Sequence, residues 1–97
     1  MIKKQVIEMM YVELEELIQK TYGWGKYSLC AAEELGNDSS WTTTVVKNGL
    51  NEFDRLDLAV MKVKGPYARQ YRTRMLMNDM CDQGILEPGD YVVEICW

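Results

Sequence analysis

A run of five consecutive β-branched residues, Thr42 to Val46, constrains the fold of this 97-residue chain more than any other stretch. Each of these side chains is stiff at χ1 and fits a pleated strand better than a helix. Four turn-forming residues, Gly36 to Ser39, precede the run, and the residues from Tyr27 onward alternate as a strand does. The stretch 27–46 therefore predicts a β-hairpin.

A helix-turn-helix is the alternative interpretation of the same stretch. Ala32–Gly36 resembles the end of a first helix with its turn glycine, and residues 40–49 would then form the second helix. Asn37 stands where that motif needs an apolar residue, and the β-branched run is a poor helix former. The hairpin is the favoured interpretation.

Apolar periodicity predicts three helices, over residues 2–22, 51–64 and 66–83. The segment 91–97 has the composition of a strand, and it needs the hairpin as a partner because a lone strand is not stable. The expected fold is a single α+β domain with a three-stranded antiparallel sheet. The expected order of elements is α-β-β-α-α-β.

The predicted helix 51–64 has a clear start and one apolar stripe. Asn51 can cap its first turn, and the acidic residues of that turn suit the positive end of the helix dipole. Apolar side chains at helical spacing predict the face that packs against the domain. They are Phe53, Leu56, Val60 and Val63.

The other two predicted helices have wider apolar faces. In helix 2–22 the apolar arc covers more than half of the circumference, which leaves part of it available for a homodimer contact. Helix 66–83 has apolar side chains on two sides, which predicts a position between the sheet and the first helix. Gly23 and Gly84 are the expected C-terminal stops.

Composition argues against catalysis. The chain has no histidine, so the commonest general base near neutral pH is missing, and we expect no enzymatic activity. Its three cysteines, Cys30, Cys81 and Cys96, lack the spacing of a zinc site and are expected to be small buried hydrophobes in a reducing cytoplasm. No metal or cofactor is expected. No apolar run reaches the length of a membrane span, and acidic residues interrupt any signal peptide.

Charge is distributed unevenly along a chain whose net charge is −4. Segment 62–74 holds five basic residues and no acidic one, whereas the rest of the chain holds six basic and fifteen acidic residues. The basic residues are candidate nucleic-acid contacts of a small regulator, although the overall negative charge opposes the approach of a polyanion. They are Lys62, Lys64, Arg69, Arg72 and Arg74.

A second candidate surface lies at the tip of the predicted hairpin. Glu33, Glu34 and Asp38 bring carboxylates close to the indole of Trp41. Acidic groups around an aromatic anchor can occupy a basic groove that normally binds nucleic acid. Trp24, just before the hairpin, is expected either to cover the core or to join this surface as an anchor.

Two segments, Ala31–Ser40 and Gly89–Trp97, are similar in character to small accessory proteins encoded by bacteriophages and prophages. The best-studied members of that class are anti-CRISPR proteins. The resemblance implies a non-catalytic protein that binds a bacterial defence effector of the CRISPR-Cas type, in the host cytoplasm, and blocks its nucleic-acid-binding surface. The alternatives are a nucleic-acid-binding regulator that uses segment 62–74 and a homodimer built on helix 2–22.

Overall fold

The structure of the protein is a computed structural model that describes residues 6–25, 40–66, 68–69 and 73–94. Within these ranges the elements are β1 (Val6–Met10), α1 (Tyr11–Tyr22), β2 (Ser40–Val45), α2 (Glu52–Lys64), α3 (Thr73–Asp82) and β3 (Gly89–Glu94). The α+β class and the three helices are confirmed. No helix in the described ranges is long and apolar enough to cross a membrane.

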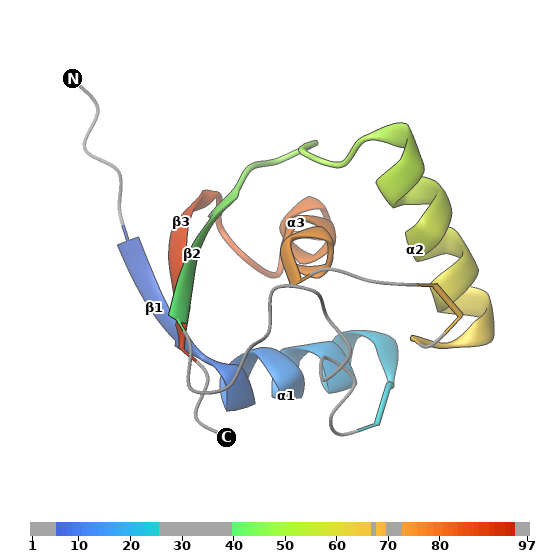
Figure 1. Ribbon diagram of the computed structural model, residues 1–97, viewed down its shortest axis with the longest axis horizontal. Helices are drawn as coiled ribbons and strands as arrows, with labels where there is room; N and C mark the ends of the chain where they lie inside the picture. Colours follow the sequence, from blue (N-terminus) through green and yellow to red (C-terminus); the bar gives the residue numbers. More distant parts are fainter. Residues whose placement is uncertain (1–5, 26–39, 67, 70–72, 95–97) are drawn as a thin grey trace.

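The three strands form one sheet in the order β1-β3-β2, with the last strand in the middle (Figure 1). β2 runs antiparallel to β3, with Val45 opposite Gly89, and β1 runs parallel to β3, with Val6 opposite Asp90. The predicted pairing of the β-branched run with the C-terminal strand is confirmed. The helix-turn-helix alternative is wrong, because residues 40–45 form a strand. The other arm of the predicted hairpin lies outside the described residues.

β1 corrects the prediction of one continuous helix over residues 2–22. Val6–Met10 is a strand, and the helix begins only at Tyr11. The sequence does not mark this boundary, because Met10 at the N-cap is extended and its side chain makes no capping hydrogen bond. Pairing with β3 satisfies backbone groups of both strands, and this long-range gain overrides helical periodicity. The sheet is therefore mixed rather than wholly antiparallel, and the described part of the chain begins with a strand.

The β-branched run alternates between the core and solvent. Thr43 and Val45 are buried, and their neighbours on either side along the strand are exposed. After β2, the Val46 N–H donates to Asn78 Oδ1 at 3.0 Å and so joins the strand to α3. Gly49 is required in the turn that follows, because a Cβ there would lie 2.7 Å from the same oxygen.

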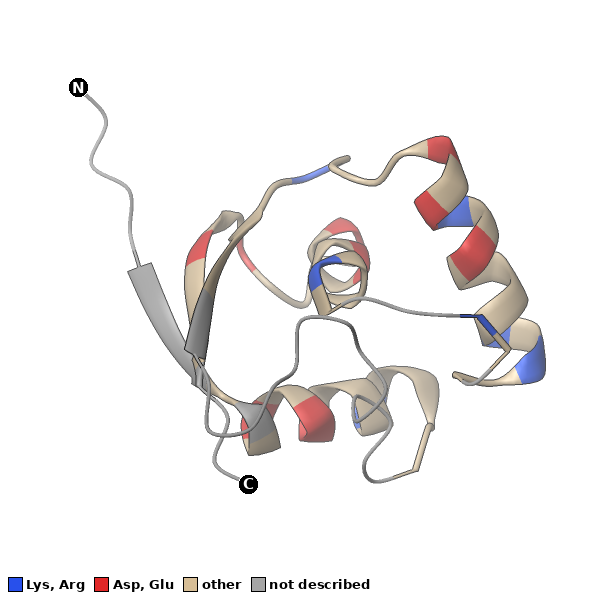
Figure 2. Ribbon diagram, viewed as in Figure 1, with Lys and Arg blue, Asp and Glu red and all other residues tan. Residues whose placement is uncertain are grey.

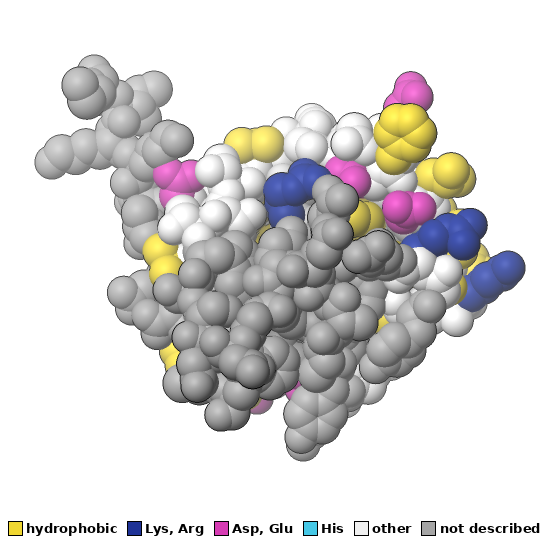
Figure 3. Space-filling view, in the orientation of Figure 1, with side chains coloured by type: hydrophobic (Ala, Val, Ile, Leu, Met, Phe, Trp, Pro, Cys, Tyr) yellow, Lys and Arg dark blue, Asp and Glu magenta, His cyan; other side chains and the backbone are white. Residues whose placement is uncertain are grey.

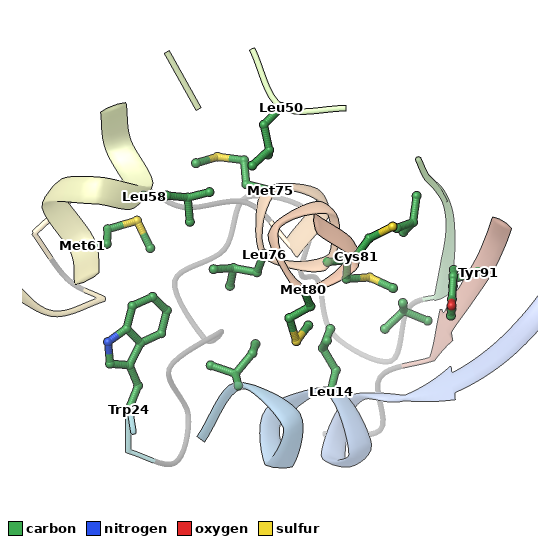
Figure 4. Close-up of a cluster of buried hydrophobic side chains, with 14 residues drawn as sticks. Leu14, Trp24, Leu50, Leu58, Met61, Met75, Leu76, Met80, Cys81 and Tyr91 are labelled. Atoms are coloured by element: carbon green, nitrogen blue, oxygen red, sulfur yellow. The ribbon is translucent and has the colours of Figure 1, made fainter. Parts of the chain in front are cut away.

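α3 is the central element of the core. Figure 1 shows it end-on, with the sheet on one side, α2 on the other and α1 below. In Figure 4 Met80 points from α3 toward Leu14 of α1, and Leu58 and Met61 extend from α2 toward α3. α3 therefore packs against the sheet, as predicted, but the element on its other side is α2, and α1 covers it from below. The buried residues of α3 are Thr73, Met75, Leu76, Met77, Asn78, Asp79, Met80 and Cys81.

Local signals place most helix ends correctly. Gly23 ends α1 in the left-handed conformation at φ 74°, and Gly84 follows α3 at φ 81°. Asn51 caps α2, because its Oδ1 accepts the Asp54 N–H at 2.7 Å. Cys81 is a free, buried thiol, as expected, whereas the other two cysteines lie outside the described residues.

The start of α3 is a further correction. The sequence predicts a helix from Pro66, but that residue lies in a turn, residues 68–69 are not helical, and the described part of α3 is Thr73–Asp82. Gly65 adopts φ 106°, which breaks the helical path after α2. The Ala68 N–H then donates to the Gly65 carbonyl at 3.2 Å and closes the turn.

Candidate protein-binding surface

The outer face of α2 carries an exposed apolar stripe. Its members are Phe53, Leu56, Val60 and Val63, called here the α2 stripe. Phe53 is 78% exposed, Leu56 63% and Val63 84%, while Val60 is partly exposed. The sequence pattern assigned these side chains to the core, and that prediction is wrong. Figure 3 shows hydrophobic side chains gathered over α2 on the viewed face.

The opposite face of α2 packs against the domain. Its buried residues are Asp54, Leu58 and Met61, and the two apolar ones are 2% and 0% exposed. At 100° per residue these three positions lie roughly opposite the α2 stripe. The helix is therefore apolar on two sides, and the domain covers only one of them.

Ion pairs between α2 and the chain that follows it hold this orientation. The side chain of Asp54 is only 9% exposed, and a buried carboxylate is costly without a nearby cation. Turning the helix to bury the α2 stripe would separate these partners. The pairs are Arg74–Asp54 and Arg69–Asp57, each at 3.6 Å, and Lys62–Asp79 at 3.1 Å.

Asp79 is the centre of a polar cluster between the three helices. Its carboxylate accepts hydrogen bonds from the Tyr22 hydroxyl, from Lys62 Nζ at 3.2 Å and from Gln83 Nε2 at 2.7 Å. The Tyr22 ring stacks on Trp24 with ring centroids 4.5 Å apart. A cleft of about 370 Å³ is lined by these donors, Trp24 and Thr21. Since all three donors converge on one carboxylate, the cluster fixes α1 and α2 relative to α3.

The cluster makes the protein sensitive to alkaline pH. Burial, then the hydrogen bond to Asp79 and the negative charge of that carboxylate, raise the pKa of the Tyr22 hydroxyl above its usual value near 10. Above pH 10 the unfolded chain therefore releases this proton while the folded chain keeps it. Stability conferred by Tyr22 is complete below pH 10, and above it we expect a loss of up to about 1.4 kcal/mol per pH unit.

Urea unfolding at pH 8 and pH 11 measures this loss. Between the two pH values, wild type should lose more of its free energy of unfolding than the Tyr22→Phe variant, which has no proton to release there. Tyr91 makes the free energy of unfolding fall with rising pH in both proteins, because burial raises its pKa as well. Equal losses in the two proteins would contradict the assignment to Tyr22.

The residues predicted at the hairpin tip fall largely outside the described ranges. Glu33, Glu34 and Asp38 are among those outside, and Trp41 is described only as part of strand β2. Trp24 is 7% exposed and belongs to the core cluster, which is the first of its two predicted roles. Its indole therefore has little surface to offer a partner.

The basic segment 62–74 does not form a free cationic patch in its described part. Arg69 and Arg74 each lie 3.6 Å from a carboxylate, and Lys62 is bound to Asp79. Lys64 is exposed at the end of α2, and Arg72 lies outside the described residues. These ion pairs offset much of the positive charge that segment 62–74 has in the sequence.

Comparison with protein-family models, curated proteins and solved structures finds no significant match to this chain. Among the residues that the structure describes, no three His, Cys, Asp or Glu side chains are arranged to hold a metal ion. The α2 stripe is the surface that sequence reasoning missed. Its signal is the 3-4-3 spacing of its members, which is also the spacing of a helix that pairs with another helix.

Proposed function

We propose that this protein is a non-catalytic protein-binding module and that α2 is its docking element. The observation that supports the proposal is the α2 stripe. Scattered exposed hydrophobic residues are ordinary, but a contiguous apolar stripe along one helix is typical of a surface that meets another protein. The large side chain of Phe53 is the expected anchor, since aromatic residues dominate the energetics of such contacts.

The proposed target is a bacterial defence effector of the CRISPR-Cas type, which the chain would inhibit by covering its nucleic-acid-binding surface. This target class rests on the sequence resemblance alone. The acidic residues Glu33, Glu34 and Asp38, with Trp41, remain the predicted contacts to a basic groove of the effector. Nucleic-acid binding by the chain itself is less favoured, because most described cations of segment 62–74 already pair with carboxylates.

An inhibition assay tests the target and the surface together. Purified CRISPR-Cas effectors cleave labelled DNA in the presence of increasing amounts of wild type or of the Phe53→Glu/Val63→Glu double variant. We expect stoichiometric inhibition of one effector by wild type and at least tenfold weaker inhibition by the variant. The variant should fold, since both side chains are largely exposed.

Two further variants locate the contact. Val12→Glu alters a valine that is 62% exposed on α1, away from the α2 stripe, and is expected to inhibit as wild type does. Glu33→Lys with Asp38→Lys tests the hairpin tip. If the α2 variant retained full inhibition while the tip variant lost it, α2 would be the wrong docking element.

A further inference from the structure

The polar residues beside the α2 stripe point to the nature of its partner. Acidic residues lie in the first turn of α2 and basic residues in the last, so the helix carries opposite charges at its two ends (Figure 2). At 100° per residue, Asp57 and Lys64 lie on one flank of the stripe and Glu52 on the other. A surface with this distribution is complementary to a reversed copy of itself.

We infer that, in the isolated protein, the α2 stripe is occupied by the α2 stripe of a second copy, with the two helices antiparallel. This inference rests on the docking role proposed for α2. The 3-4-3 spacing gives two layers of contact. When the two helices are aligned so that position 58 of each lies at the same height along the pair, Phe53 meets Val63 of the second copy, and Leu56 meets its Val60. The same contacts recur on the other half of the pair, as two-fold symmetry requires.

Charge selects the antiparallel arrangement. Lys64 then lies on the same side of the pair as Asp57 of the second copy, displaced by about 7.5 Å along the axis, which a lysine side chain can span. Arg69, 3.6 Å from Asp57, leaves that carboxylate 37% exposed and able to accept a second cation. A parallel pair would instead bring Glu52 close to Asp57 of the second copy, and like charges would repel. The antiparallel pair also opposes the two helix dipoles.

The contact is small, so the association should be weak and reversible. α2 has 13 residues and is about 20 Å long, and a pair of such helices buries less than the ~800 Å² per partner of a standard interface. Because one stripe holds one partner at a time, this dimer would compete with docking on another protein.

Sedimentation equilibrium between about 10 µM and 1 mM protein tests the inference. Wild type should shift from the 11.3 kDa monomer toward twice that mass as concentration rises. Val63→Glu should stay monomeric, and Val12→Glu, a matched change at another exposed helical valine, should dimerise as wild type does. A wild type that is monomeric throughout would overturn the inference. Weaker inhibition by the Phe53→Glu/Val63→Glu variant than by wild type in the effector assay would still support α2 as a docking element. If Val12→Glu abolished dimerisation and Val63→Glu did not, the dimer contact would be assigned to α1, and this result would also overturn the inference.

A charge exchange tests the orientation. Lys64→Asp and Asp57→Lys should each weaken dimerisation by roughly three- to tenfold, because each creates two like-charge pairs in the symmetric dimer. The combined Asp57→Lys/Lys64→Asp variant, with Arg69→Glu added so that residue 57 keeps its ion pair within the chain, should recover most of the wild-type association. If the combined variant were as weak as the worse single variant, the antiparallel arrangement would be wrong.

Discussion

Replacing Asp79 with alanine is expected to lower the free energy of unfolding by about 2 kcal/mol, because the change removes a buried carboxylate that accepts hydrogen bonds from three side chains. The carboxylate is 7% exposed and binds the Tyr22 hydroxyl, the Lys62 ammonium group and the Gln83 amide. Lys62 can turn to solvent, since its side chain is 42% exposed. Gln83 is exposed as well, so most of the loss should come from the Tyr22 hydroxyl, which is only partly exposed.

The matched control for this variant is Asp82→Ala, in the same helix. Asp82 is partly exposed and accepts one hydrogen bond, from the Asn48 N–H at 2.6 Å. We expect that change to cost about 1 kcal/mol or less. Urea unfolding followed by circular dichroism gives both values. If the free energies of unfolding of the two alanine variants lay within about 0.5 kcal/mol of each other, Asp79 would not be the centre of the helix junction.

Two leucines of α2 give the second large effect and a direct test of which face is buried. Leu58 is 2% exposed and Leu56 63%. Leu58→Ala should lower the free energy of unfolding by about 3 kcal/mol through lost burial and a cavity, whereas Leu56→Ala should change it by less than about 0.5 kcal/mol.

The comparison is internally controlled, because both changes remove the same atoms from the same helix only two positions apart. Chemical denaturation at a protein concentration low enough to keep the chain monomeric isolates folding from association. The opposite ranking would mean that α2 is turned so that the α2 stripe packs on the domain, as the sequence pattern alone predicts.

The elements that sequence reasoning predicted correctly are those specified by neighbouring residues. The β-branched run formed β2 because every residue in it disfavours a helix. Gly23, Asn51 and Gly84 ended or began helices because their conformations and side chains act within a single turn. Such signals need no knowledge of the rest of the fold.

The elements that it missed depend on partners far away in the sequence. Val6–Met10 has a pattern compatible with a helix, and its strand form requires β3 alongside it. In α2 the four-residue stripe outnumbers the two apolar residues of the buried face, so periodicity favoured the wrong side. The observed orientation of α2 is instead held by ion pairs to α3 and to the segment before it, including Arg74–Asp54. No local sequence pattern indicates these pairs.

The central place of β3 in the sheet (Figure 1) has a consequence for how the chain is made. Within the described residues, β1 and β2 hydrogen-bond to β3 and not to each other. Neither can find its neighbour until residues 89–94 have left the ribosome, so the sheet assembles late, through contacts of long sequence separation that form slowly. A nascent chain halted before Gly89 would contain β1 and β2 without β3, the strand to which both of them hydrogen-bond. The unpaired edges of these strands would make such a chain prone to aggregation.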